Sequence, residues 1–414
     1  MTLRTSRPLA VLIAATLATV AIATAFLGSP GARAHHSPGH GGGGGGTPPT
    51  ATPPPAPVDD GWVYYYGLAG DDRVIYRTSP DGSVNGLVAG APGEYDPHGF
   101  GWAGLGVPSH VAHDGDRWYL SHVAASPDIV FPNVNGPYFR IALEIDAIRE
   151  GDAVGTRLTD NVAACNYVWS FPAWARSASG TPDAAVTWAG VQWADQDGDA
   201  AGDCETLVSA GIFRADLTYD AAGAVTGMSA PVLVVSVPID AASNVPNLQY
   251  FDWSPNGATV AYSRTTGGLW VAAAGSPIGS HTQIVAGNLH HVTWSVDQDP
   301  GTAGLQTTIA FTGTPKNSKR GTWSVQPSGT GLKLLAEAKQ GKNSSQTSFY
   351  HTTPFWSPAG THMAYGVWET GGPLGSQTNA SVRRMAADGT GNVLLQADSP
   401  ALDINRLLGW TAPD

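Results

Sequence analysis

The chain has 414 residues, with 33 acidic and 21 basic side chains and a formal charge of −12. A protein this acidic binds the phosphate backbone of nucleic acids poorly, so we expect no nucleic-acid partner. Its 52 glycines and 31 prolines interrupt the sequence too often for long helices. This composition is typical of many short strands joined by turns.

The chain begins with the pattern of a secretory signal peptide. Arg4 and Arg7 precede an apolar run over residues 9–27, and the motif Ala32-Arg-Ala34 follows. A charged front, an apolar middle and a small-x-small exit predict a signal peptide over residues 1–34 and an extracytoplasmic location, periplasmic or secreted. An uncleaved membrane anchor is the alternative, because a run of about 19 apolar residues is long enough to span a bilayer. We expect no membrane span in the mature chain.

Residues 35–60 are rich in histidine, glycine and proline. Such a segment cannot bury a core, and we predict that it is a disordered tether. From residue 61 to the end, short runs of β-branched and aromatic residues alternate with Gly, Pro, Asp and Asn turns. We therefore predict one all-β domain over residues 61–414.

The domain contains a repeated Trp-Ser-Pro anchor. The clear copies are Trp253-Ser-Pro-Asn-Gly257 and Trp356-Ser-Pro-Ala-Gly360, and each is followed by an apolar strand that ends in Ala-Tyr. Weaker equivalents bring the anchors to six, at Val111, Trp174, Trp253, Trp294, Trp356 and Trp410. Each anchor marks a predicted four-stranded antiparallel meander, and radial stacking of the meanders buries both faces of each.

The same alignment assigns further strands to each unit. Ile141, Leu143 and Ile145 sit two apart, so Phe139–Ile145 is predicted as one strand and not as a helix. Within it, Phe139–Ile141 is the predicted third strand of its unit. A count of seven units would require the long interval between Trp174 and Trp253 to hold two.

The sixth repeat is divided between the two ends of the domain. Trp410 is followed by only four residues, and the strand that should come next appears as Trp62-Val-Tyr-Tyr-Tyr-Gly67. We predict that Leu408–Trp410 supplies the innermost strand of the unit that begins at Trp62. The C-terminal strand would then close a ring of six blades.

These motifs carry a family resemblance. The repeat runs from Trp-Ser-Pro-x-Gly through Ala-Tyr and an aromatic strand to an x-Asp-Gly turn. This pattern resembles the WD40-like (PD40) repeat of TolB-like β-propellers, over residues 61–414. The resemblance implies a six-bladed β-propeller in an extracytoplasmic compartment. TolB carries a separate α/β domain before its propeller, where this chain has only the tether. The particular partnership of TolB is therefore not implied.

An acidic run has the spacing of a calcium-binding loop. Its carboxylates are Asp195, Asp197, Asp199, Asp203 and Glu205. Carboxylates at alternate positions of a short loop can converge on one hard cation, so we predict a structural calcium site. The run lacks the expected turn glycine and the glutamate at its twelfth position. A solvated acidic turn without metal is the alternative.

Cys165 and Cys204 are the only cysteines of the chain. In an exported protein an even pair favours a disulfide over two free thiols. Cys204 lies inside the acidic run, so the predicted disulfide would restrain the same loop.

Three histidines are candidates for a binding site. His290, His291 and His351 lie just before the anchors Trp294 and Trp356, hence on or beside the innermost strands, which line the central channel of a propeller. They could meet at the channel mouth and bind a ligand or a transition metal. Hydrogen bonding to the backbone is the plainer alternative, and few basic residues lie near these histidines in the sequence.

All five lysines fall between Lys316 and Lys342, together with Arg320. The cluster is either a docking patch for an anionic partner or a solvated face.

The sequence contains no Gly-x-Ser-x-Gly elbow and no His-Glu-x-x-His motif. We therefore predict an exported, monomeric propeller that binds a protein, peptide or cell-envelope component without catalysis. The alternative is a metal-dependent lyase or hydrolase of acidic polysaccharides that uses the channel histidines. That alternative predicts basic side chains beside them.

Overall fold

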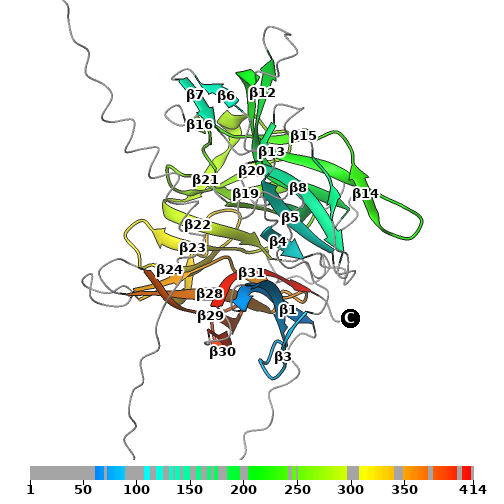
Figure 1. Cartoon of the computed structure of the whole chain (residues 1–414). Coiled ribbons are helices and arrows are strands. Elements are labelled where there is room, and N and C mark those ends of the chain that lie inside the picture. The colour runs from blue at the N-terminus through cyan, green and yellow to red at the C-terminus, as the bar shows by residue number, and fades with distance from the viewer. Residues whose placement is uncertain are drawn as a thin grey trace, which may run out of the picture. The chain divides into compact units, whose positions relative to one another are not determined.

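The computed structural model describes residues 61–69, 72–88, 107–111, 118–124, 130–133, 136–139, 143–149, 155–159, 166–168, 172–175, 184–195, 204–240, 245–248, 250–295, 307–339, 348–371, 376–398 and 403–411. The predicted signal peptide and tether lie outside these ranges and stay predictions. All the described residues belong to one compact unit, Pro55–Asp414. Their regular structure consists of β-strands and one short 3-10 turn, Ile278–Ser280 (Figure 1). Among them, no helix is long and apolar enough to cross a membrane.

Six antiparallel sheets contain four or more strands, and we number them in chain order. Sheet 1 has the order β31 (Asp403–Thr411), β1 (Trp62–Ala69), β2 (Asp72–Thr78), β3 (Asn85–Leu87). Sheet 2 has the order β4 (Val107–Val111), β5 (Trp118–Ala124), β8 (Leu143–Arg149), β9 (Thr156–Arg157). In sheet 3, β10 (Asn166–Val168) and β11 (Ala173–Ala175) both pair with β12 (Ala185–Asp195). The next strand, β13 (Cys204–Tyr219), pairs with β12 on one side and with β14 (Val225–Met228) and β15 (Val232–Ser236) on the other.

The remaining sheets follow the same plan. Sheet 4 has the order β18 (Tyr250–Trp253), β19 (Thr259–Ser263), β20 (Leu269–Ala273), β21 (Thr282–Val285). Sheet 5 has the order β22 (Gly287–Trp294), β23 (Ile309–Pro315), β24 (Gly321–Val325), β25 (Lys333–Glu337). In sheet 6, β26 (Ser348–His351) and β27 (Phe355–Trp356) pair with β28 (His362–Gly371), followed by β29 (Ser376–Ala386) and β30 (Val393–Ala397). Two separate hairpins are β6 (Val130–Asn133) with β7 (Gly136–Phe139), and β16 (Ile239–Asp240) with β17 (Val245–Pro246).

Each predicted anchor lies on the first strand of a different sheet: β4, β11, β18, β22, β27 and β31. These first strands contact one another in sequence, β31 with β4, β4 with β11, β18 with β22, β22 with β27 and β27 with β31. Strands that meet in this way are the innermost strands of the arrangement. The prediction of an all-β propeller with antiparallel blades is therefore confirmed.

The anchor motif recurs because it closes the turn after the innermost strand. In the first clear copy, the Gly257 N–H donates to the Ser254 carbonyl (2.8 Å) and the Thr259 N–H donates to Ser254 Oγ (3.0 Å). In the second, the Gly360 N–H donates to the Ser357 carbonyl at 2.8 Å. Serine and glycine thus fix a tight turn that sends the chain directly into the second strand.

Six buried clusters join the sheets in a cycle. Each contains side chains from two consecutive sheets, as in Ile145 with Trp188, Ile212 with Tyr262, Ala261 with Phe311, Ala310 with Tyr365, Val382 with Trp410, and Leu408 with Ile148. The last two clusters return the cycle through sheet 1 to sheet 2. The core therefore lies between the blades, where each sheet buries both of its faces.

The C-terminal strand closes sheet 1, as predicted. β31 pairs antiparallel with β1, with Trp410 opposite Val63. Trp410 is 1% exposed and packs with Val63 and Tyr65 of its own sheet and with Val382 of sheet 6. The prediction that Leu408–Trp410 completes the unit beginning at Trp62 is confirmed.

One strand assignment is wrong. Phe139 ends β7, which pairs with β6 in a separate hairpin, and the third strand of sheet 2 is β8. The run from Glu144 to Ile148 is buried on both faces of β8. Leu143 and Ile145 of the predicted run belong to β8, where they alternate with Glu144 and Asp146. The two-residue period is therefore that of β8, and extending the run back to Phe139 joined two separate strands.

Candidate functional site

A bulge in the innermost strand β22 places a residue other than glycine in left-handed backbone. The ladder between β22 and β23 shifts register between His290 and Thr293, and His291 has a φ of 49°. Left-handed backbone is rare for residues other than glycine and is often retained at functional sites. The bulge turns both histidine rings toward Tyr250 on β18, with ring centroids 6.4 Å from His290 and 4.2 Å from His291. Re-aiming side chains is a recurrent role of β-bulges.

His291 also contacts the segment between β26 and β27. Its Nδ1 lies 2.9 Å from Thr353 Oγ1 in that segment. Tyr250, His291 and Thr353 each stand three residues before an anchor tryptophan, the first two on β18 and β22. These repeat-equivalent side chains therefore touch in a row, and we call the three residues the inner row. Sequence reasoning selected His291 but missed Tyr250 and Thr353.

His351 lies beside the inner row and bridges sheets 5 and 6. Its Nδ1 is 2.8 Å from Thr322 Oγ1 on β24, and its ring lies 5.0 Å from the Tyr365 ring. Burial, with the positive charges of Arg383 and Arg320, lowers the pKa of His351 to about 4. Burial and the Arg320 charge also lower the pKa of His290. Both side chains are therefore neutral near pH 7.

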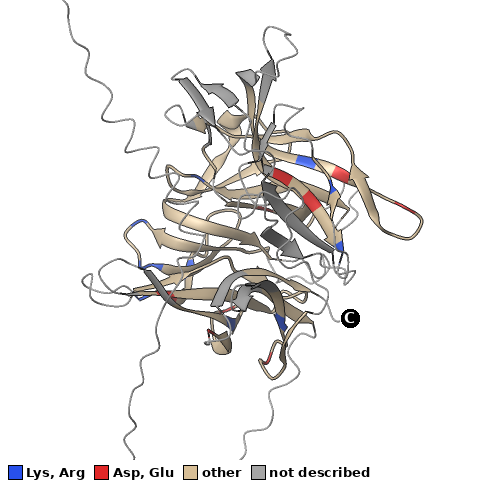
Figure 2. Ribbon diagram, in the orientation of Figure 1, with Lys and Arg blue, Asp and Glu red and all other residues tan. Residues whose placement is uncertain are grey.

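Two arginines supply the positive charge of this region. Arg320 acts on the pKa of both His290 and His351, and its guanidinium carbon lies 4.1 Å from the centre of the Tyr350 ring. Arg383 on β29 acts on the pKa of His351. Both arginines are distant from these histidines in the sequence, so their effect on the pKa arises between strands that the fold brings together. Figure 2 shows Lys and Arg gathered around the ends of β23 and β24.

This arrangement combines neutral imidazoles, hydroxyls, tyrosine rings and guanidinium groups. Guanidinium and imidazole N–H groups donate hydrogen bonds, and the arginine charge favours an anionic acceptor. Within the described ranges, no three His, Cys, Asp or Glu side chains are placed to share a metal ion. These side chains can therefore recognise a polar or anionic group by hydrogen bonding and charge.

The predicted calcium loop connects the two longest strands of sheet 3. Asp195 ends β12 and lies opposite Cys204 in the ladder with β13, so the two ends of the loop are held together. Glu205 follows on β13, and no side chain is described at either acidic position. Asp197, Asp199 and Asp203 lie outside the described residues, as does Cys165. The calcium site and the disulfide with Cys204 stay predictions.

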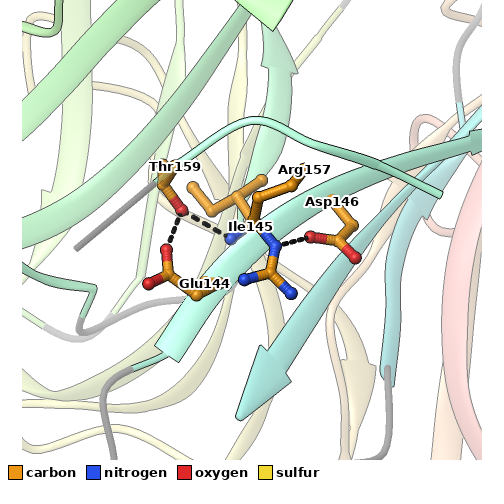
Figure 3. A network of polar contacts seen from close by, with 5 residues as sticks. All are labelled: Glu144, Ile145, Asp146, Arg157 and Thr159. Atoms are coloured by element: carbon orange, nitrogen blue, oxygen red, sulfur yellow. Dashed lines mark hydrogen bonds and ion pairs between the residues drawn. The ribbon is translucent and has the colours of Figure 1, made fainter. Parts of the chain in front are cut away.

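A second polar cluster, which sequence reasoning missed, lies in sheet 2 (Figure 3). Glu144 and Asp146 share one face of β8 and are 1% and 2% exposed. Arg157 of β9 forms an ion pair with Asp146. The Thr159 hydroxyl accepts from the Ile145 N–H at 2.8 Å and donates to the Glu144 carboxylate (Figure 3). Buried carboxylates need such partners, so this cluster joins β9 and the residues after it to β8.

The fold and the inner row define a β-propeller with a polar site on its innermost strands. No family model matches the sequence. No curated protein matches it either.

Solved structures with a similar arrangement include a protein from Agrobacterium tumefaciens assigned as TolB (11% identity, TM-score 0.46, 85% of this chain and 93% of that one). TolB from Acinetobacter baumannii is similar at 14% identity and a TM-score of 0.46, over 86% of this chain and 68% of that one. An oligogalacturonate lyase in complex with manganese is similar at 13% identity and a TM-score of 0.39, over 82% and 75%. Likenesses this distant carry no argument about the ligand of this chain.

Proposed function

We propose that the chain is an exported, monomeric, TolB-like propeller of six blades that binds a protein, peptide or cell-envelope component without catalysis. The observation that carries the proposal is the inner row, in which Tyr250, His291 and Thr353 touch across three sheets. The left-handed backbone of His291 costs about 1–3 kcal/mol. Strained backbone of this kind clusters at functional sites, where it holds a side chain in one orientation.

Six sheets joined by six clusters support the count of six blades. In sheet 2 the innermost strand, β4, is described by its backbone alone, so the count rests there on strand pairing. The predicted signal peptide supports an extracytoplasmic location.

The lyase alternative receives one observation in its favour, since the positive charges of Arg320 and Arg383 act on the pKa of His351. Against it, the described residues hold no group of three metal-binding side chains. Binding without catalysis therefore fits the described geometry better.

Site-specific photo-crosslinking tests the proposal. A photoreactive amino acid replaces Tyr250 in one variant and Asn256 in the control, because Asn256 lies in the turn at the other end of the innermost strand and is exposed. After incubation with a cell-envelope fraction of the source organism, mass spectrometry identifies the adduct. We expect one defined adduct from position 250 and none from position 256, and loss of that adduct when His291→Ala is added to the first variant.

Equal labelling at the two positions would contradict a site at the inner row. Turnover of uronic-acid oligomers by the purified protein with added manganese, abolished by His351→Ala, would overturn the non-catalytic role.

A further inference from the structure

Sheet 5 is basic although the chain as a whole is acidic. The chain has a formal charge of −12. The described residues of sheet 5 and its turns contain one acidic side chain, Glu337, against five basic ones: Lys316, Lys319, Arg320, Lys333 and Lys339. The four lysines are exposed. A positive surface on a negative protein directs anionic partners to one place.

Four of these charges lie at one end of the sheet. Lys316, Lys319 and Arg320 belong to the turn between β23 and β24. The ladder pairs Gly321 with Glu337, so Lys339, two residues beyond Glu337, lies at the same end. We call Lys316, Lys319, Arg320 and Lys339 the basic stripe.

The basic stripe continues toward the inner row. The Phe349 N–H donates to the Lys339 carbonyl at 2.8 Å, which joins the outer end of sheet 5 to β26. Arg320 lies over Tyr350 and close enough to His290 and His351 to lower the pKa of both. Positive charge therefore follows this end of sheet 5 from Lys339, after the outer strand β25, to Lys316, whose N–H donates at 2.8 Å to the carbonyl of Ala286 just before the innermost strand β22.

The stripe already binds a carboxylate of its own chain. Lys319 Nζ lies 2.7 Å from Glu337 Oε2, and the two side chains are 65% and 43% exposed. An ion pair this exposed contributes little to stability and exchanges readily for another carboxylate. Glu337 therefore shows the contact that an external carboxylate would make.

We propose that the basic stripe binds an acidic, extended segment of a partner protein. The inference rests on the proposed function, because the stripe leads to the inner row, and it adds the chemistry of the partner. Lysines on flexible stems suit carboxylates that project at intervals from an extended peptide. An acidic polysaccharide fits less well, since Arg320 lies over one face of Tyr350, the exposed aromatic ring described at the stripe, and so reduces the surface on which a sugar ring could stack.

Fluorescence anisotropy with the whole mature protein tests the inference. The probe is a labelled peptide of alternating Glu and Ser, about ten residues long and thus about 33 Å when extended. The triple variant Lys316→Glu, Lys319→Glu, Lys339→Glu reverses the stripe. Lys333→Glu is the matched control, because Lys333 is an exposed lysine at the other end of the same sheet. We expect the triple variant to weaken binding at least about tenfold and the control to stay within about twofold. Binding should also weaken with added salt.

Three results would overturn the inference. The first is no binding of the acidic peptide at low salt, and the second is equal binding of a peptide with Gln in place of Glu. The third is binding of polygalacturonate but not of the peptide, which would assign the stripe to a polysaccharide. Thermal melts verify that the variants fold. The two proposals can fail separately. If the acidic peptide does not bind, the crosslink from position 250 is still expected. If the inner row is not a binding site, that crosslink is lost but the peptide still binds the basic stripe.

Discussion

Trp410 and Val63 lie opposite each other in one sheet although they come from the two ends of the described chain. The Trp410 ring fills the space between sheets 1 and 6, where it packs against Val382. The pair therefore joins the last strand to the first, and the cycle of sheets depends on it.

Removing the Trp410 side chain should destabilise the whole domain. A buried tryptophan replaced by alanine costs about 3–5 kcal/mol, through lost burial and the cavity left behind. We expect Trp410→Ala to lower the free energy of unfolding by this amount in urea denaturation, and deletion of residues 403–414 to prevent folding. Val393→Ala is the control, because Val393 is 38% exposed on the outer strand β30 and should change stability by less than about 0.5 kcal/mol. A stable, cooperatively folded deletion variant would contradict closure by β31.

Gly389 lies where the turn after β29 packs closely against sheet 5. It has a φ of 85°, and a Cβ added there would lie 2.8 Å from the Leu335 carbonyl oxygen of sheet 5. Gly389→Ala should cost about 1–2 kcal/mol for the left-handed backbone and about 1–2 kcal/mol more for the overlap. Gly391→Ala is the matched control, because Gly391 also has a positive φ but no atom lies within 4 Å of its added Cβ. Equal losses in thermal unfolding for the two variants would show that the turn does not pack against sheet 5.

Stability should depend on pH through His351. Its pKa falls from 6.5 to about 4 on folding. Between these values the unfolded chain binds a proton that the folded chain does not, so stability is lost as the pH falls from 6.5 toward 4 and is regained as it rises. The loss reaches at most about 3 kcal/mol.

His351→Asn removes the titration and retains a side-chain N–H for Thr322. Urea denaturation at several pH values should show a shallower slope for this variant over that window. Part of the slope should remain, because burial lowers the pKa of His290 and of His281 as well. Asp81 has a pKa of about 2 and titrates below the window. An unchanged slope in the variant would contradict a buried, neutral His351.

Chelation should test the predicted calcium loop. If the loop binds calcium only in the folded state, calcium at about a hundred times its Kd adds about 2.7 kcal/mol. We expect EGTA to lower the Tm of the wild type and to leave that of Asp197→Asn, Asp199→Asn unchanged. Asp220→Asn is the control, since Asp220 is an exposed acidic residue in the neighbouring β13–β14 turn. No response of the wild type to EGTA would identify the loop as a solvated acidic turn.

Much of the fold was predictable because the repeat is local. Ser254 and Gly257 close their turn with hydrogen bonds inside the motif, so any copy of the motif marks the end of an innermost strand. The split copy at Trp410 and Trp62 then predicted closure. The third strand of sheet 2 was placed too early, because the predicted run Phe139–Ile145 covers the end of a hairpin strand, β7, and the start of β8.

The candidate site was predictable only in part. His290, His291 and His351 could be selected by their distance from the anchors. Tyr250 and Thr353 share the position of His291, three residues before an anchor, and this repeat position is a signal that could have selected them. Their contact with His291 could not be predicted, because the φ of His291 depends on a bulge and its ring packs on Tyr250, which lies far away in the sequence. No local signal placed Arg320 or Arg383 beside His351, since both reach it across strands that come together only in the folded domain.

The sequence by itself determined the class of fold, the number of anchors and the strand that joins the two ends, because turn chemistry and strand period act over a few residues. Only the tertiary structure decided which side chains meet at the inner row and which charges surround the histidines. Those contacts form between sheets, and they depend on how neighbouring blades pack against each other.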